Sequence, residues 1–310
     1  LCSFGVSSSL FALEGTPMQH DENSNAISVG LVSNGNGQLL QLGRYYIYTS
    51  LRNVGFIKQL TYDSSSGEYV GDKSFSTADT STQNINVTTA VKEPGIIYLD
   101  LANSNKESYC ASAVWDSSNS VWWVACRSLN SSTKYVTYLL KVTTAGSISY
   151  YPTDIGGGTT NNKHGYPGRQ GSLILDGTNL ILVGYRGSTI VSPGTSSSYR
   201  PFIAKFDTTA VPSNGSQWSS SALTEFTDTD SDTSTGAYNY RAVGVVKIGS
   251  NYFSVYTHIT NGGYRVAKFN TSLVAQASGF FSSLSFPSNP FGDTPTAFPT
   301  SLAYYSTNST

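Results

Sequence analysis

Three aspartates alternate in the polar segment 227–236, at Asp228, Asp230 and Asp232. Alternating carboxylates can converge on Ca²⁺, so this segment is a candidate cation site. Thr233 stands where an EF-hand loop needs a glycine, and no glutamate closes the segment. The pattern therefore favours a solvated acidic loop over a metal centre, and no cofactor is expected.

Asp116 and Asp176 occupy equivalent turn positions in two similar segments. A pair of carboxylates about 5 to 10 Å apart could hydrolyse a glycosidic bond, but aspartate before serine or glycine is also a common turn residue. The three histidines show no metal-binding spacing, and neither a phosphate-binding loop nor a Gly-x-Ser-x-Gly motif occurs. The sequence therefore predicts a protein without a catalytic constellation.

Cys110 and Cys126 flank an expected hairpin whose turn centres near Ser118. Antiparallel pairing about that centre places the two cysteines directly opposite each other, so a disulfide is predicted, with two reduced core cysteines as the alternative. A closed loop of about 15 residues gives about 3 kcal/mol of stabilisation on the chain-entropy estimate. The remaining cysteine, Cys2, is either a buried thiol or a bond to another subunit.

Composition and sequons point to an extracellular protein. Charged residues make up 12% of the chain and the net charge is -1, which disfavours a nucleic-acid partner. No apolar run is long enough to span a membrane, and the start at Leu1 suggests that a signal peptide has been removed or that the chain is part of a longer one. N-glycosylation sequons begin at Asn86, Asn130, Asn214, Asn270 and Asn308.

Short apolar runs separated by turn residues repeat along the chain, which indicates a repeat architecture. The clearest copy has its runs at 173–175, 180–185 and 202–207. A second copy has runs at 245–248, 252–256 and 266–270, and a third has runs at 113–116, 121–125 and 138–143. In the fourth copy, residues 39–48 are expected to hold two strands and a shorter turn, followed by a strand at 56–60.

A fifth copy is incomplete. Residues 301–308 resemble the first strand and its turn, and the missing strands are found at 1–5 and 9–13. We expect residues 1–13 to complete the blade begun by 297–310, either in the same chain or in a neighbouring one. Residues 77–105 fit the period poorly and are interpreted as an insertion or an atypical outer strand.

Several runs are apolar at consecutive positions, so their strands must be covered on both faces. Radially stacked antiparallel sheets provide such cover. The sequence therefore predicts an all-β chain that forms one domain over residues 1–310, a β-propeller with five blades, six being possible. Trp122 and Trp123 should point to opposite faces, one into the core and the other available to stack on a sugar ring.

The Ala-Lys-Phe-Asp/Asn endings at 204–207 and 267–270 resemble the repeats of bacterial extracellular β-propeller proteins. The resemblance implies a structural or ligand-binding platform without a shared catalytic set. We therefore expect a non-catalytic extracellular structural or adhesive glycoprotein that self-associates into a surface filament or array. The alternative is a carbohydrate-binding, lectin-like propeller or a glycoside-active enzyme.

Overall fold

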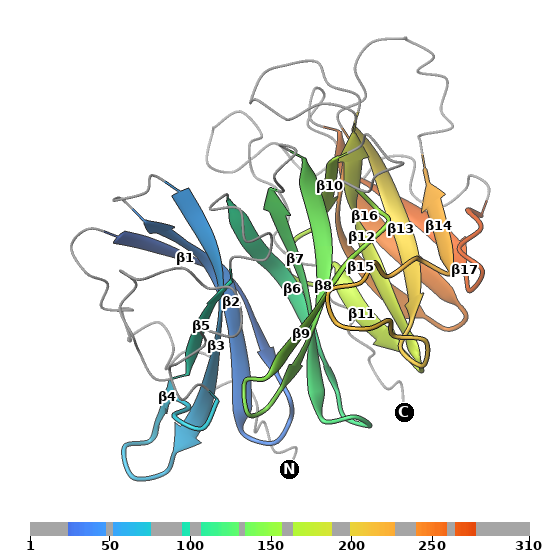
Figure 1. Ribbon diagram of the computed structural model, residues 1–310. Helices are drawn as coiled ribbons and strands as arrows, with labels where there is room; N and C mark the ends of the chain where they lie inside the picture. The colour runs from blue at the N-terminus through green and yellow to red at the C-terminus, as the bar shows by residue number, and fades with distance from the viewer. Residues whose placement is uncertain are drawn as a thin grey trace, which may run out of the picture.

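The computed structural model describes residues 24–47, 52–75, 95–99, 107–129, 134–156, 164–187, 199–226, 240–258 and 264–276. This part of the chain contains 17 strands in four antiparallel sheets and no helix. Figure 1 shows how the strands are arranged. The all-β expectation is therefore correct. The described residues give four sheets, where the sequence predicted five or six blades.

The four sheets follow one another along the chain. Sheet 1 contains β1 (Ser24–Ser33), β2 (Gln38–Ile47), β3 (Arg52–Asp63), β4 (Glu68–Gly71) and β5 (Ile96–Leu99). Sheet 2 contains β6 (Ser108–Asp116), β7 (Val121–Leu129), β8 (Tyr135–Thr143) and β9 (Ile148–Pro152). Sheet 3 contains β10 (His164–Pro167), β11 (Leu173–Asp176), β12 (Asn179–Gly187), β13 (Tyr199–Asp207) and β14 (Ala222–Glu225). Sheet 4 contains β15 (Tyr240–Ile248), β16 (Asn251–His258) and β17 (Tyr264–Asn270).

Strand register shows that the sheets are copies of one unit. In sheets 2, 3 and 4 a lysine of the third strand pairs with the third residue of the second strand, in the pairs Lys141–Trp123, Lys205–Ile181 and Lys268–Phe253. In sheet 1 the same position holds Gln59, which pairs with Leu40. The repeat predicted from sequence is therefore present, with glutamine replacing lysine in its first copy.

The hairpin expected within residues 39–48 is wrong. β2 runs through this segment as one strand, and its hairpin partner is β1, which the sequence interpretation missed. The turn lies at residues 34–37, where Gly35 and Gly37 adopt φ values of 77° and 81°. Glycine reaches this left-handed region without steric cost, so the Asn-Gly-Asn-Gly run reverses the chain here.

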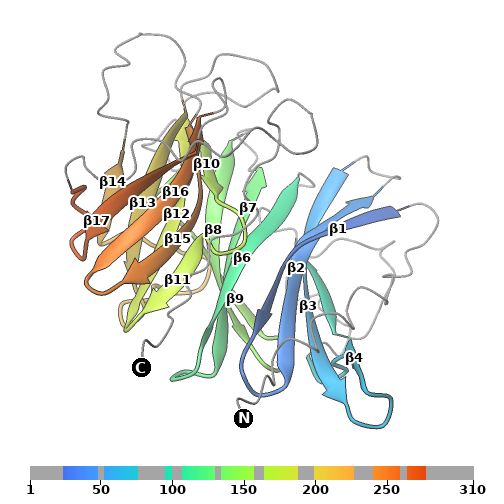
Figure 2. The same ribbon diagram turned by 180° about the vertical axis from the view of Figure 1, so that it is seen from behind.

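Each sheet packs face to face on the next, as Figures 1 and 2 show from opposite sides. Successive side chains of a strand point to opposite faces, so every inner sheet contributes to two cores. On β7, Trp122 packs into the core shared with sheet 1 and Trp123 into the core shared with sheet 3. On β12, Leu182 belongs to the core shared with sheet 2 and Val183 to the core shared with sheet 4. Two neighbouring residues of an inner strand therefore both need apolar side chains, which explains the runs that are apolar at consecutive positions.

The first strand of every sheet is interrupted at the same place. One residue bulges between Ser28 and Gly30 in β1, between Cys110 and Ser112 in β6, and between Ala242 and Gly244 in β15. In sheet 3 the interruption is longer, because residues 168–172 separate β10 from β11 although both pair with β12. We call residues 168–172 the hub loop.

The hub loop touches the interrupted strand of each of the other three sheets. Its Gly171 N–H donates to Ser112 Oγ of sheet 2 over 3.2 Å, and its Gly171 carbonyl accepts from Val245 N of sheet 4 over 2.9 Å. The side chain of Gln170 lies against Gly30 of sheet 1, where an added Cβ would meet the flexible end of that side chain. The first strands of the four sheets therefore converge on one loop.

The atypical region of sheet 1 lies at its outer edge. β4 and β5 both pair with β3, at Leu60–Asp63 and Gly55–Lys58 respectively, so that together they take the place of a single outer strand. β5 lies within the segment 77–105 that the sequence marks as an insertion or atypical outer strand. Residues 76–94 and 100–106, and both segments of the expected fifth blade, lie outside the described residues.

Candidate functional site

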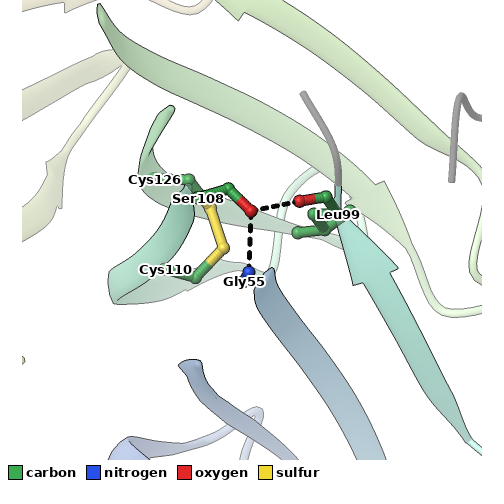
Figure 3. The surroundings of a disulfide bond; sticks show 5 residues. All are labelled: Gly55, Leu99, Ser108, Cys110 and Cys126. Atoms are coloured by element: carbon green, nitrogen blue, oxygen red, sulfur yellow. Dashed lines mark hydrogen bonds between the residues drawn. A yellow bond between two sulfur atoms is a disulfide. The ribbon is translucent and has the colours of Figure 1, made fainter. Parts of the chain in front are cut away.

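The disulfide predicted from sequence joins Cys110 of β6 to Cys126 of β7. Both cysteines are fully buried in the core between sheets 1 and 2. Next to them, Ser108 Oγ donates to the Leu99 carbonyl oxygen and accepts from Gly55 N over 2.7 Å (Figure 3). The disulfide end of the β6–β7 pair is thus hydrogen-bonded to sheet 1.

The two acidic turn residues are held by hydrogen bonds. Asp116 accepts from the backbone N–H groups of Ser118 and Asn119 and from Trp123 Nε1. Burial alone would raise the pKa of Asp116, but the bonds from Asn119 and Trp123 outweigh it and hold the pKa below its ordinary value. The arrangement is that of a turn aspartate, and its low pKa suits no general acid.

Asp176 ties sheet 3 to sheet 4. Its Oδ1 accepts from Lys247 Nζ and its Oδ2 from the Tyr252 hydroxyl, both over 2.6 Å. Burial alone would raise the pKa of Asp176, but the bonds from Lys247 and Tyr252 lower it below its ordinary value. Asp176 is therefore an ionised bridge between neighbouring sheets.

The tryptophan pair is wholly structural. Trp122 and Trp123 are 0% and 1% exposed, so neither offers a face to a sugar as the sequence suggested. Trp122 Nε1 donates to Gln59 Oε1 over 3.0 Å, and Gln59 Nε2 donates to Asp72 Oδ2 over 2.9 Å. Gln59 of sheet 1 thus supplies the acceptor for the buried indole N–H of Trp122 in sheet 2.

Two of the five sequon asparagines are described. Asn214 is exposed on a turn, and its Oδ1 accepts from Tyr150 N over 2.9 Å. Asn270 is half-buried, and its Oδ1 accepts from the N–H groups of Ser272 and Val274 over 3.0 and 2.9 Å. Asn86, Asn130 and Asn308 lie outside the described residues, as do Cys2 and the aspartates Asp228, Asp230 and Asp232.

A cluster whose side chains suit ligand binding surrounds Arg127, near the end of β7 away from the β6–β7 turn. The Arg127 Cζ atom lies 5.1 Å from the ring centre of Tyr109, 5.2 Å from Tyr135 and 5.0 Å from Tyr166. The ring of Tyr185 stacks on Tyr166, with centroids 4.8 Å apart. We call these five residues the tyrosine cage.

Strand pairing assembles the tyrosine cage. Tyr109 of β6 pairs directly with Arg127, and Tyr166 of β10 pairs directly with Tyr185 of β12. Tyr135 begins β8 and pairs with Leu129, two residues beyond Arg127 on β7. The cage therefore lies across the interface of sheets 2 and 3 and takes its side chains from five strands.

The groups beside the cage are engaged with each other rather than with Arg127. Glu107 Oε2 accepts from the Tyr135 hydroxyl over 2.8 Å, and Glu107 Oε1 accepts from Asn53 Nδ2 over 2.9 Å. Burial and this bond to Glu107 raise the pKa of Tyr135 to about 12, so the phenol is neutral. His164 Nδ1 accepts from Tyr135 N, and burial, with the charge of Lys134, lowers the pKa of His164.

The sequence interpretation did not find the tyrosine cage. Its members are separated by up to 76 positions and share no motif. The available signal was a positive charge, Arg127, at the end of an apolar strand in a chain with 21 tyrosines. That signal identifies no partner, since the cage requires sheets 2 and 3 to be packed together.

No protein-family model matches the chain, and no curated protein is significantly similar to it. Within the described ranges, no group of three or more histidine, cysteine or acidic side chains could hold a metal ion. The same residues contain no helix long and apolar enough to cross a membrane.

Proposed function

We propose that this chain is a non-catalytic extracellular structural glycoprotein, built as a five-bladed β-propeller that self-associates into a surface filament or array. The observation that carries the proposal is the character of the two end sheets. Val54 and Phe56 on the outer face of sheet 1 are fully buried, yet they belong to none of the three cores between described sheets. The corresponding face of sheet 4 carries half-buried valines, Val246, Val255 and Val266.

Apolar faces at both ends of an arc of sheets favour one more sheet between them. An antiparallel sheet with two apolar faces needs cover on both sides, which radial stacking provides. The convergence of four first strands on the hub loop supports a common axis. The incomplete fifth copy at 297–310 and 1–13 supplies strands of the right pattern.

Self-association follows if residues 1–13 complete the blade of a neighbouring chain. Donation between subunits is head to tail, and it gives a ring when the rotation closes and a filament when it does not. The disulfide and the five sequons support an extracellular location, where disulfides persist and N-glycans are added.

Deletion of residues 1–13 tests the proposal. The full chain should form rings or filaments in electron micrographs, and the deletion variant should lose that assembly or fail to fold. A synthetic peptide of residues 1–13, added to the deletion variant, should restore the melting temperature. A peptide with the same composition in scrambled order is the control. An unchanged melting temperature and unchanged oligomeric state after deletion would contradict the proposal.

A further inference from the structure

The guanidinium of Arg127 has aromatic neighbours but no anionic one. Among the described residues, none accepts a hydrogen bond from it or forms an ion pair with it. The carboxylate of Glu107, beside the cage, accepts from Tyr135 with one oxygen and from Asn53 with the other. Arg127 therefore keeps its positive charge and its five N–H donors for another acceptor.

Four of the five residues of the tyrosine cage are partly accessible to solvent. Arg127, Tyr109, Tyr135 and Tyr185 are all partly exposed, whereas Tyr166 is buried behind them. A guanidinium binds a carboxylate through two parallel hydrogen bonds, a geometry that favours planar acids over point charges. Tyrosine rings add flat apolar faces and hydroxyl groups, which suit a ring-shaped, hydroxylated molecule.

We propose that the tyrosine cage binds a sugar acid, with Arg127 pairing the carboxylate and the tyrosine rings packing against the sugar ring. The proposal identifies the site and the ligand class for the alternative of a carbohydrate-binding propeller. It does not depend on subunit assembly, because all five cage residues belong to sheets 2 and 3 of one chain.

The groups beside the cage fit a ligand that carries one carboxylate on an otherwise neutral ring. Tyr135 is a neutral phenol bonded to Glu107, and His164 uses Nδ1 as an acceptor, so neither compensates the charge of Arg127. Arg186 is not available as a second cation, since it pairs with Glu225 and also reaches the Ile155 carbonyl oxygen. Arg127 is the cation that faces the tyrosine rings, and its single charge matches one carboxylate.

Titration calorimetry on the full chain tests this inference with the tetramer of galacturonic acid as the probe. The methyl ester of the same tetramer keeps the sugar ring and removes the charge. We expect the acid to bind at least tenfold more tightly than the ester to the unmodified chain. Equal affinity for the two forms, or no binding of the acid, would overturn the inference.

Variants then assign the binding to Arg127. Arg127→Met keeps an apolar stem among the rings and removes the charge, and it should weaken binding of the acid at least tenfold while leaving the ester unchanged. Arg169→Met removes an exposed arginine outside the cage and is the matched control. If Arg127→Met does not fold, Tyr109→Ala is the second variant. It removes one partly exposed ring and should weaken binding of the acid severalfold. Binding that survives both changes would overturn the assignment.

Discussion

Cys110 lies opposite Cys126 because Ala111 bulges out of β6. If the pairing that starts at Asp116 and Val121 continued without interruption, Cys110 would face Arg127 instead. The same bulge presents Ser112 Oγ to the hub loop, where it accepts from the Gly171 N–H, and to the first residue of β11, Leu173, whose N–H also donates to it. One extra residue therefore aligns the disulfide on one side and the inter-sheet contact on the other.

Reduction of the disulfide should destabilise the protein by about 3 kcal/mol, because the open chain regains loop entropy in the unfolded state. The double change Cys110→Ala and Cys126→Ala should give a similar loss. Thermal unfolding with and without reductant measures the effect, in a Cys2→Ser background so that only this pair responds. An unchanged melting temperature, with reduction of the pair verified by peptide mapping, would rule out a stabilising role.

Gly168→Ala should cost about 1 to 3 kcal/mol, as overpacking of a tight interior site does. A methyl group there would lie 2.6 Å from the Val243 carbonyl oxygen, which belongs to the backbone and cannot rotate away. Gly30→Ala is the matched control, since its new methyl meets the flexible end of Gln170. Chemical denaturation should give a smaller loss for Gly30→Ala; equal losses would argue against a tightly packed hub loop.

Gln59→Leu should destabilise the fold by about 1 to 3 kcal/mol, because Trp122 Nε1 would lose its acceptor in a fully buried site. Denaturant unfolding monitored by tryptophan fluorescence measures the change. Gln41→Leu, half-buried on the neighbouring strand β2, should change stability little. A loss of the same size for both variants would mean that the hydrogen bond to Trp122 contributes nothing specific.

Asp176→Asn should lower stability by about 1 kcal/mol at neutral pH, the scale of a partly exposed ion pair. The native pKa of Asp176 is lowered, so its contribution is present above the unfolded pKa of about 3.9 and is lost as pH falls through the lower native value. The difference between the two proteins should therefore shrink below about pH 4. Urea unfolding from pH 7 to pH 2.5 measures it.

The Tyr252→Phe variant separates the two partners of Asp176. It removes the neutral donor and leaves the ion pair with Lys247, so it should lower stability at neutral pH and should reduce, without abolishing, the acid-dependent part of the Asp176 contribution. A stability difference between wild type and Asp176→Asn that does not vary with pH would contradict an ionised bridge.

The sequence by itself determined the repeated strands and the disulfide partners. Strand register repeats every two residues and turns are local, so apolar runs and glycine-containing turns predict hairpins directly. The same locality explains the error at residues 39–48, where apolar residues continue through Gly43 and the true turn is the Asn-Gly-Asn-Gly run at 34–37. The cysteine partners were predicted correctly from a turn centred near Ser118, but the turn pairs Asp116 with Val121, and only the bulge at Ala111, which was not predicted, brings Cys110 opposite Cys126.

Only the tertiary structure decided which side chains of different sheets contact one another. Arg127 meets Tyr166, and Asp176 meets Lys247, through the packing of separate sheets. Such contacts depend on which face of each strand meets its neighbour and on where the first strand bulges. A bulge changes the pairing by one residue and leaves no distinct mark in composition or period. For that physical reason the tyrosine cage and the hub loop could not be predicted from the sequence.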